Sequence, residues 1–583
     1  MIDRLLRTFR TAYHLRSSQI MWRSLYSFER RLRVPFPSWS IQFSRVPSIR
    51  PDFPPIPVFS SCESAKGVIK GLSQSTLKLL NQEHLIGTES PDWRLGHNTS
   101  QRLQIITLHY HKWLYDVAEA AASGQEDAQE ALRLFKHYLS DWILRCDVDI
   151  PGSRELAWNP YAIATRISWW IRSFQALPKS CWDSEPELRS MFLGSLQKQA
   201  AYLYRHLEYD IRGNHLFRDA VGLALAGRHF EHPRSQQWLA KAAQIAWAQA
   251  DEQVLQDGGH FERSPMYHIT VMDDLATLAH LLDDGPARER MRRTWERMAE
   301  CLAWLHHPDG QIPLFNDAAF NGTCAPGRML RQGSFLGWSE EGPPKRGAML
   351  LPSFGLVVWH GDPWTIFFDV GPIGVDYQPG HGHADTLTLE ASFQGYRLFV
   401  DPGTYGYDPD ERRRYDRSTA AHNTVCVDET DSSEVWHIFR CGRRAYPDRV
   451  QLFESPYGFT ASASHTGYRH LPGRPQPWRE VTLHGDQRLV IKDRCDGKGV
   501  HRLSGGWLLG PGWTVTSCDN GWRVYRPESG ALKIRMHGPP GLRLNLSPRW
   551  YHPEFGMEMV TRRLEWTVET ALPTDITTVH EPE

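Results

Sequence analysis

The chain has 583 residues, more than one ordinary hydrophobic core accommodates, so we expect two or three domains. Its net charge of −1 at pH 7 excludes a globally basic surface, and we expect no nucleic-acid partner. The nine cysteines are odd in number and include no CxxC pair. This pattern argues against a disulfide framework or a zinc finger and suits a reducing compartment.

The N-terminus is strongly basic, with ten arginines against two carboxylates in residues 1–50. Leu5, Phe9, Ala12 and Leu15 follow helical spacing, which predicts a basic amphipathic helix. One interpretation is peripheral contact with an anionic membrane surface. The other is a helix that packs on the next domain with its arginines in water.

Targeting signals give a further expectation about localisation. The chain contains no run of eighteen apolar residues, so we expect no transmembrane helix. The N-terminus lacks the apolar core and cleavage site of a signal peptide. We therefore favour a cytoplasmic or inner-membrane-associated protein over a periplasmic one.

Composition and periodicity divide the chain into three parts. Residues 1–75 combine the basic helix with a Pro- and Ser-rich connector, and residues 76–340 are rich in helical patterns. Apolar residues recur at helical spacing in segments such as YAIATRISWWIRSFQAL and SQQWLAKAAQIAWAQA. Short turns between such segments predict antiparallel helical hairpins, which close into a ring or a solenoid.

Residues 341–583 show a different sequence pattern, typical of β-strands. Short β-type runs such as GLVVWHG, WTIFFDVG and YRLFVDPG alternate with Gly, Asp and Pro. This spacing predicts an antiparallel β-sandwich. The expected fold class is thus a multidomain α+β protein, helical first and β second.

The stretch from Tyr377 to Asn423 is the densest in chemistry-bearing residues. It contains three histidines and several carboxylates between Gly-Pro turns. On a strand, alternate side chains point to one face, so His381, His383 and Asp385 are expected to share a face.

Two metal triads fit this stretch. His383, Asp401 and His422 supply two imidazoles and a carboxylate, a common zinc set. His383, Asp385 and His422 instead form the HxD…H pattern of non-haem iron oxygenases. His381 is left over in both schemes and is available for proton transfer. The alternative to any metal is that these groups cap turns and bond to one another.

Two segments of the helical part are also candidates. Asn214 and His215 open an apolar helix, where Asn214 is a favoured N-cap. The polar segment DGGHFERSPMYH carries Glu262, Arg263 and Tyr267, although a tyrosine in a helical domain is usually part of the core.

The run DERRRYDRS, residues 410–418, offers four arginines. These arginines could face an anionic ligand, or they could lie on a solvated loop.

Taken in order, these segments resemble the heparinase II/III family of polysaccharide lyases. The resemblance covers roughly residues 95–440 through LHYHKWLYDV, WNPYAIATRISWW, GNHLFRDAVGLALAG, DGGHFERSPMYH, PLFND, GHGHADTLTLEASFQGYRLFVDPGTYGY and AAHNTV. It implies an N-terminal (α/α) toroid followed by an antiparallel β-sandwich.

The resemblance also implies roles for single residues. Asn214 and His215 match the pair that faces the substrate carboxylate, Tyr267 matches the catalytic tyrosine, and His381 matches the histidine of proton abstraction. A structural Zn²⁺ is implied on three ligands: His383, Asp401 and His422.

We expect further contacts with an anionic polysaccharide from Glu262, Arg263, Tyr405 and Arg417. The predicted function is cleavage of a uronic-acid-containing polysaccharide by β-elimination at an interdomain cleft. The sequence specifies neither the sugar nor the oligomeric state.

Three alternatives stay open. A non-catalytic exopolysaccharide-binding or biosynthesis-accessory protein would retain the same fold. An iron oxygenase would use the HxD…H set. A glycoside hydrolase would need two carboxylates across the scissile bond, and Glu262 is the only candidate in the helical segments singled out.

Overall fold

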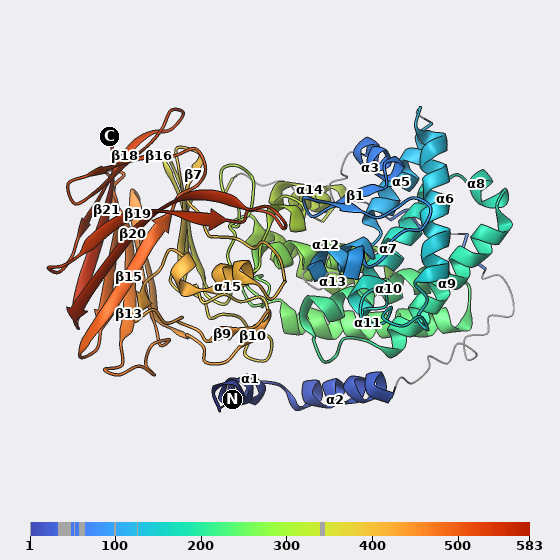
Figure 1. Cartoon of the computed structure of the whole chain (residues 1–583), viewed down its shortest axis with the longest axis horizontal. Coiled ribbons are helices and arrows are strands. Elements are labelled where there is room, and N and C mark those ends of the chain that lie inside the picture. The colour runs from blue at the N-terminus through green and yellow to red at the C-terminus, as the bar shows by residue number, and fades with distance from the viewer. Residues whose placement is uncertain are drawn as a thin grey trace. The chain divides into compact units, whose positions relative to one another are not determined.

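The computed structural model is shown in Figure 1. It describes residues 2–32, 48–51, 53–56, 65–97, 101–124, 126–338 and 344–583. Most of the predicted Pro-rich connector, residues 34–47 and 57–64, lies outside the described residues.

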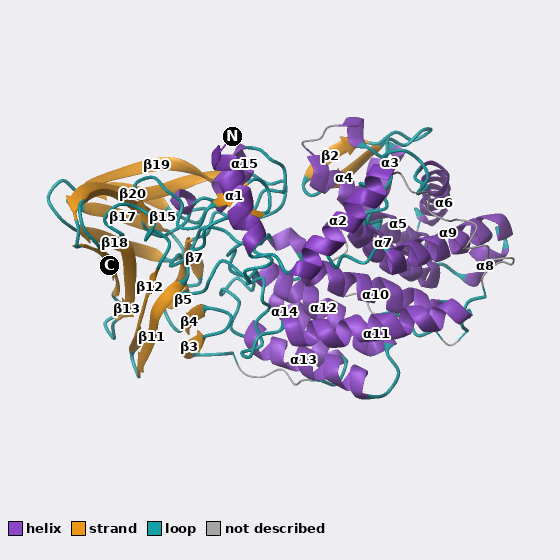
Figure 2. Cartoon of the chain, turned by 90° about the horizontal axis from the view of Figure 1, so that it is seen from below, coloured by secondary structure: helices purple, strands orange, loops and turns teal. Residues whose placement is uncertain are grey.

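Helices precede the large sheets along the chain, apart from one short helix in the β part (Figure 2). The α-helices are α1 (Ile2–Tyr13), α2 (Ser17–Leu32), α3 (Ala65–Ser73), α4 (Arg102–Leu108), α5 (Lys112–Ala122), α6 (Ala128–Arg145), α7 (Pro160–Ala176), α8 (Lys179–Asp183), α9 (Pro186–Arg205), α10 (Gly213–His229), α11 (Pro233–Gln253), α12 (Pro265–Leu281), α13 (Pro286–Leu302), α14 (Pro326–Phe335) and α15 (Glu411–Arg417). Short 3₁₀ turns are η2 (Leu95–His97), η4 (Phe320–Gly322) and η5 (Thr419–Ala421).

The strands begin with a small hairpin, β1 (Thr76–Leu79) and β2 (Gln82–Leu85), and continue after α14. They are β3 (Gly347–Leu351), β4 (Leu356–His360), β5 (Trp364–Asp369), β6 (Leu389–Phe393), β7 (Tyr396–Phe399), β8 (Cys426–Val427), β9 (Val435–Trp436), β10 (Arg440–Cys441), β11 (Pro447–Ser455), β12 (Gly458–His465), β13 (Gln476–Leu483), β14 (Leu489–Asp496), β15 (Val500–Leu508), β16 (Thr514–Cys518), β17 (Gly521–Arg526), β18 (Gly530–His537), β19 (Arg543–Tyr551), β20 (Met559–Ala571) and β21 (Thr574–Pro582).

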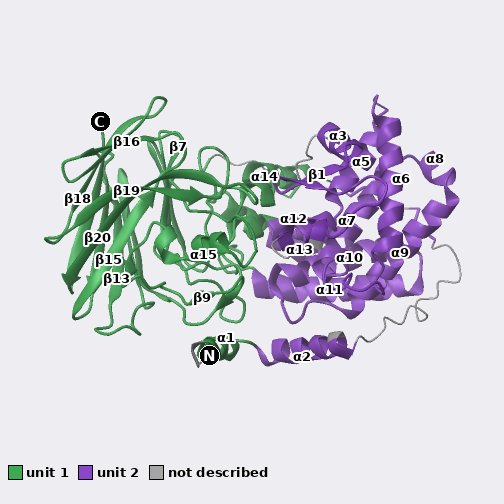
Figure 3. Ribbon diagram, in the orientation of Figure 1, with its two compact units in different colours: residues 1–15, 254–269, 296–583 green, residues 16–253, 270–295 purple. Residues whose placement is uncertain are grey.

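The chain forms two compact units, coloured separately in Figure 3. Unit 1 comprises Met1–Leu15, Val254–Ile269 and Glu296–Glu583, and unit 2 comprises Arg16–Gln253 and Thr270–Trp295. Each unit is described by itself below.

Unit 2 is built from helices that pack in pairs, among them α5 with α6 and α10 with α11. Two glycines of α10 allow close packing on its neighbours. A Cβ atom at Gly222 would lie 2.8 Å from Cα of Ala164 in α7. A Cβ atom at Gly227 would lie 2.8 Å from the carbonyl oxygen of Ser235 in α11. These contacts fix α10, whose first turn carries two of the predicted site residues.

The β part of unit 1 contains three large antiparallel sheets. Their strand orders are β11-β12-β13-β14-β21-β18-β17-β16, β19-β20-β15-β8 and β3-β4-β5-β6-β7. Residues alternate between buried and half-buried along β13, as expected for a strand with one face on a core. All three sheets contribute to one buried cluster, through Trp364 of β5, Trp507 of β15 and Trp522 of β17. The predicted fold class, helical toroid followed by antiparallel sandwich, is confirmed.

One local prediction is wrong. The segment that carries His381, His383 and Asp385 is not a strand, because β5 ends at Asp369 and β6 begins at Leu389. The segment is a loop that connects two paired strands. It therefore places its side chains through individual hydrogen bonds rather than through strand alternation.

Candidate active site

Tyr267 and His381 lie against each other in unit 1. Tyr267 stands in the first turn of α12, His381 stands in the β5–β6 loop, and their ring centroids are 4.0 Å apart. His381 Nε2 lies 3.9 Å from Oε2 of the buried Glu262. The hydroxyls of Tyr267 and Tyr407 are 2.9 Å apart. Tyrosine, histidine and a carboxylate thus gather at one place.

The start of α12 explains how Tyr267 is held. The backbone N–H of Tyr267 donates to Oγ of Ser264 over 3.3 Å, and the Ser264 hydroxyl donates to the carbonyl oxygen of Asp317 over 2.6 Å. Upstream, the turn at Gly258 and Gly259 has no room for larger residues. Gly258 has φ +83°, and a Cβ atom at Gly259 would lie 2.5 Å from the Phe354 ring.

Asp317 links the two histidines of the β5–β6 loop. Its Oδ2 lies 2.8 Å from His381 Nδ1, and its Oδ1 lies 2.9 Å from His383 Nε2. The Arg413 guanidinium forms two further bonds to the same carboxylate. Burial opposes ionisation of Asp317, yet the Arg413 charge and the two histidine bonds hold its pKa well below its usual range. The ionised carboxylate therefore accepts from all three partners.

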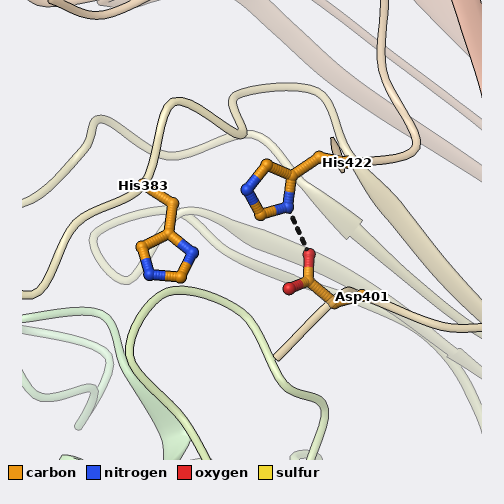
Figure 4. A group of neighbouring side chains, drawn as sticks. All are labelled: His383, Asp401 and His422. Carbon is orange, nitrogen blue, oxygen red and sulfur yellow. Dashed lines mark hydrogen bonds and ion pairs between the residues drawn. The ribbon is translucent and has the colours of Figure 1, made fainter. Parts of the chain in front are cut away.

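His383, Asp401 and His422 form a buried group that could hold a metal ion (Figure 4). One candidate ligand atom from each lies within 4.8 Å of the others. His422 Nδ1 is 2.7 Å from Asp401 Oδ2. Asp401 lies just after β7, and His422 follows η5. Within the described residues, this is the one such group of histidine, cysteine and carboxylate side chains.

The chemistry of this group fits a divalent cation. His383 Nε2 is bonded to Asp317, so the ring presents Nδ1, which is buried without a hydrogen-bond partner. Burial lowers the pKa of His383 to about 3, so the imidazole is neutral, as a metal ligand must be. Burial also raises the pKa of Asp401 well above its usual range, which a nearby cation would reverse.

The HxD…H alternative is not supported by the geometry. Asp385 is buried in the same loop but is not a member of the group formed by His383, Asp401 and His422. Burial, together with the Asp401 charge, raises the pKa of Asp385, although the nearby His422 opposes this shift.

Asn214 and His215 lie in unit 2, at the first turn of α10. The capping interpretation of Asn214 is wrong, because the N-cap residue is Arg212 and Asn214 lies inside the helix. Asn214 is buried, whereas 27% of the His215 side chain is exposed. His215 Nδ1 lies 3.1 Å from Oε1 of Glu208, which orients the ring. The polar pair thus occupies the first turn of α10, ahead of the apolar residues Leu216 and Phe217.

The remaining predicted substrate contacts differ in availability. Arg263 donates to the carbonyl oxygens of Ser353 and Phe354. Arg417 is buried and donates to several carbonyl oxygens, including that of Gly382. The structure gives both guanidiniums a structural role.

Tyr405 is half-buried, with the Arg412 guanidinium 4.3 Å from its ring centre. The solvated-loop interpretation of residues 410–418 is wrong in part. Residues 411–417 form α15, in which Arg413 and Arg417 are buried.

Two site residues, Asp317 and Tyr407, were missed in the sequence, and Arg413 was considered only as a contact for an anionic ligand or as part of a solvated loop. Asp317 closes the quoted PLFND segment, Arg413 belongs to the arginine run, and Tyr407 closes the PGTYGY segment. All three segments were visible, but no spacing rule connects Asp317 with Arg413, which lies 96 residues later.

Comparisons with known proteins place the chain in a family. The family model "Heparinase II/III N-terminus" matches residues 70–332, and "Heparinase II/III-like, C-terminal" matches residues 343–579. A heparin-sulfate lyase of Bacteroides stercoris is 25% identical over 514 residues, covering 79% of this chain and 72% of that protein. FtsZ-localized protein C of Caulobacter vibrioides is 25% identical over 379 residues, covering 63% of this chain and 60% of that protein.

The fold has solved counterparts as well. A crystal structure of heparinase III superposes with a TM-score of 0.76 at 18% identity, covering 92% of this chain and 87% of that one. The predicted resemblance is confirmed: the chain belongs to the heparinase II/III-like family of polysaccharide lyases.

Proposed function

We propose that this protein cleaves a uronic-acid-containing polysaccharide by β-elimination. The observation that carries the proposal is the pairing of Tyr267 with His381, whose ring centroids are 4.0 Å apart. Asp317 accepts from His381 Nδ1, which fixes the tautomer and leaves Nε2 for proton transfer. A tyrosine beside an oriented histidine supplies a base and an acid, the two groups that elimination requires.

The reaction needs one proton removed and one delivered. The base takes the proton from C5 of the uronate, the electron pair forms the C4–C5 double bond, and the C4–O4 bond breaks. The acid protonates the departing O4. Tyr267 and His381 suit these two roles, and their assignment depends on whether the C5 proton lies syn or anti to O4.

The carboxylate at C5 resists a second negative charge, so the developing aci-enolate must be stabilised. We assign this role to Asn214 and His215. Amide and imidazole N–H groups donate to carboxylate oxygens, and donors placed where charge develops lower the barrier. Glu208, 3.1 Å from His215 Nδ1, orients the ring for such contact.

We assign His383, Asp401 and His422 to a structural Zn²⁺. The ion would supply positive charge to the buried Asp401. His383 belongs to the loop that carries His381, so a bound ion would also stiffen that loop. No step of the elimination uses the ion.

Four predicted substrate contacts are narrowed to two. Glu262 and Tyr405 stay in the proposal, whereas Arg263 and Arg417 are left out because their guanidiniums donate to backbone carbonyl oxygens.

Heparin-type and other polyuronides are the substrate class to test, since the related protein of Bacteroides stercoris is a heparin-sulfate lyase.

A double-mutant cycle tests whether residues of both units act on one uronate. Asn214→Ala and Tyr267→Phe would be measured singly and together on the same substrate. We expect strong non-additivity in kcat/KM, because both changes raise the barrier of one step. An unchanged kcat/KM in Asn214→Ala would remove Asn214 from the chemistry, and purely additive losses would show that the two residues act without coupling.

The runner-up function, a binding protein without activity, has its own signature. It requires polysaccharide affinity that survives Tyr267→Phe and His381→Ala, with no change in polymer length in any variant. Product mass also separates elimination from hydrolysis, because the hydrolysis product carries one additional water.

A further inference from the structure

The N-terminal helix α1 is oriented opposite to an ordinary surface helix. Its polar side contacts unit 1: Arg10 Nε donates to Glu434 Oε2 over 2.7 Å, and Trp436 Nε1 donates to Thr11 Oγ1 over 3.1 Å. Its apolar side is exposed to solvent, with Leu5 64% and Phe9 69% exposed. The expected packed helix is thus observed in part: α1 contacts the protein through Arg10 and Thr11, whereas its apolar side faces solvent.

The apolar residues of α1 form a continuous stripe. Leu5, Phe9 and Tyr13 stand four residues apart, so they lie one above another on the helix, and all are exposed. Leu6 extends the stripe on one side. Arg7, which lies 3.4 Å from Glu434, stands on the opposite, protein-facing side.

Helix α2 repeats this arrangement on unit 2. Its buried Gln19 donates to the carbonyl oxygen of Asp210 over 3.4 Å, and the Tyr26 hydroxyl donates to that of Leu207 over 2.6 Å. The opposite side carries four exposed apolar side chains at helical spacing: Met21, Leu25, Phe28 and Leu32. Hydrogen bonds thus hold both helices by their polar sides.

These exposed side chains are concentrated rather than scattered. Among the described residues, nine of the 22 exposed large apolar side chains belong to α1 and α2. Isolated apolar residues on a surface are ordinary, but a contiguous exposed stripe marks each of these two helices as a binding face.

Charge indicates what these helices bind. Four of their arginines are exposed: Arg4 and Arg7 on α1, and Arg23 and Arg31 on α2. Arg7 lies near Glu434 and Arg23 donates to the carbonyl oxygen of Asp210, so these two also contact the protein. Two copies of such a face would repel each other, which argues against self-association. An apolar stripe flanked by arginines matches a surface that is negative outside and apolar beneath, as an anionic bilayer is. No helix among the described residues is both long and apolar enough to cross a membrane.

We propose that α1 and α2 are each a peripheral membrane anchor helix that lies in the headgroup region of an anionic bilayer. The apolar stripes enter the acyl boundary, and Arg4 of α1 and Arg31 of α2 contact lipid phosphates. This inference does not depend on the lyase activity, because none of the proposed catalytic residues belongs to these helices.

The test is co-sedimentation of the full-length protein with vesicles. Phosphatidylcholine vesicles would be compared with vesicles that also contain phosphatidylglycerol. We expect the protein to sediment with the anionic vesicles and to be released by added salt. The double variants Leu5→Glu/Phe9→Glu and Leu25→Glu/Phe28→Glu should each lower the partition coefficient at least tenfold.

Phe453→Glu is the matched control, because Phe453 of β11 is 64% exposed, as Leu5 is, yet lies outside the anchor. It should bind vesicles like the wild type, and unchanged thermal melting would show that all variants are folded. The proposal is overturned if the wild type ignores anionic vesicles, or if the double variants bind as well as the wild type. A concentration-dependent dimer without vesicle binding, lost in Leu5→Glu/Phe9→Glu, would overturn it in favour of a second copy.

Discussion

His381 and His383 stand two residues apart in the same loop, and both bond to Asp317, yet their surroundings differ. His381 bonds through Nδ1 and presents Nε2 beside Glu262 and the Tyr267 ring. His383 bonds through Nε2 and presents Nδ1 within the buried group of Asp401 and His422. One carboxylate orients two imidazoles in opposite senses.

The chemistry available to each histidine depends on which ring nitrogen is hydrogen-bonded to Asp317 and on which groups lie near the other ring nitrogen. In the proposed function, the same residue type in the same loop serves proton transfer in one case and metal binding in the other. Variants on either side should therefore separate turnover from metal content and stability.

The largest effect on turnover is expected from Tyr267→Phe, on the catalytic side. Loss of the hydroxyl should lower kcat by about 10³-fold or more, because the proposed acid or base is removed. Tyr407→Phe is the control, since it deletes the other half of the same hydroxyl–hydroxyl hydrogen bond. Equal losses in both variants would reduce the role of Tyr267 to a structural one.

His381→Ala should lower kcat by roughly 10²-fold or more while zinc content and melting temperature stay at wild-type values. Steady-state kinetics, metal analysis and thermal melting check the three readouts. His537→Ala, on the exposed part of β18, controls for histidine removal in general. Loss of zinc together with turnover would mean that His381 and His383 are not functionally distinct.

Asp317→Asn should affect both the proposed catalytic histidine His381 and the proposed metal ligand His383. Turnover should fall by roughly 10–100-fold, and zinc retention should weaken, because the two imidazoles lose their common acceptor. The buried Arg413 would also lose its ion pair, at a cost of about 3–5 kcal/mol in the free energy of unfolding. A variant that loses turnover but binds zinc normally would contradict the shared role of Asp317.

His383→Ala should have the smallest effect on turnover and a large one on stability. We expect zinc content to fall to background and the free energy of unfolding to drop by more than about 3 kcal/mol. Turnover per folded molecule should change by less than about tenfold, because the proposed acid and base are untouched.

Removal of zinc with a chelator tests the same metal group in the wild-type protein. A strong chelator should lower the melting temperature of the wild type towards that of His383→Ala and leave the variant unchanged. Stoichiometric zinc in purified variants of all three ligands, His383, Asp401 and His422, would remove the metal assignment.

Much of the fold was predictable from local pattern. The alternation along Gln476–Leu483 reflects a strand with one buried face, and the change from helical to β texture falls between α14 and β3. Residue types and spacing alone allowed two metal triads, and the family resemblance favoured the one that the structure brings together, His383, Asp401 and His422.

The rest depended on long-range pairing, which local pattern does not encode. Arg413 looked solvated within a charged run, and only Asp317, 96 residues earlier, explains its burial. Asn214 looked like an N-cap, but the helix begins one residue earlier, at Gly213. The reversed orientation of α1 depends on Glu434, 424 residues away from Arg10.

The most direct test of the central claim is ultraviolet absorbance during incubation with a panel of polyuronides. Elimination creates a conjugated, unsaturated uronate, whereas hydrolysis and binding do not. We predict a steady rise with at least one polymer, which disappears in Tyr267→Phe and in His381→Ala but persists in Tyr407→Phe. A flat trace across the panel with folded wild-type protein, or a rise unaffected by Tyr267→Phe and His381→Ala, would contradict the account.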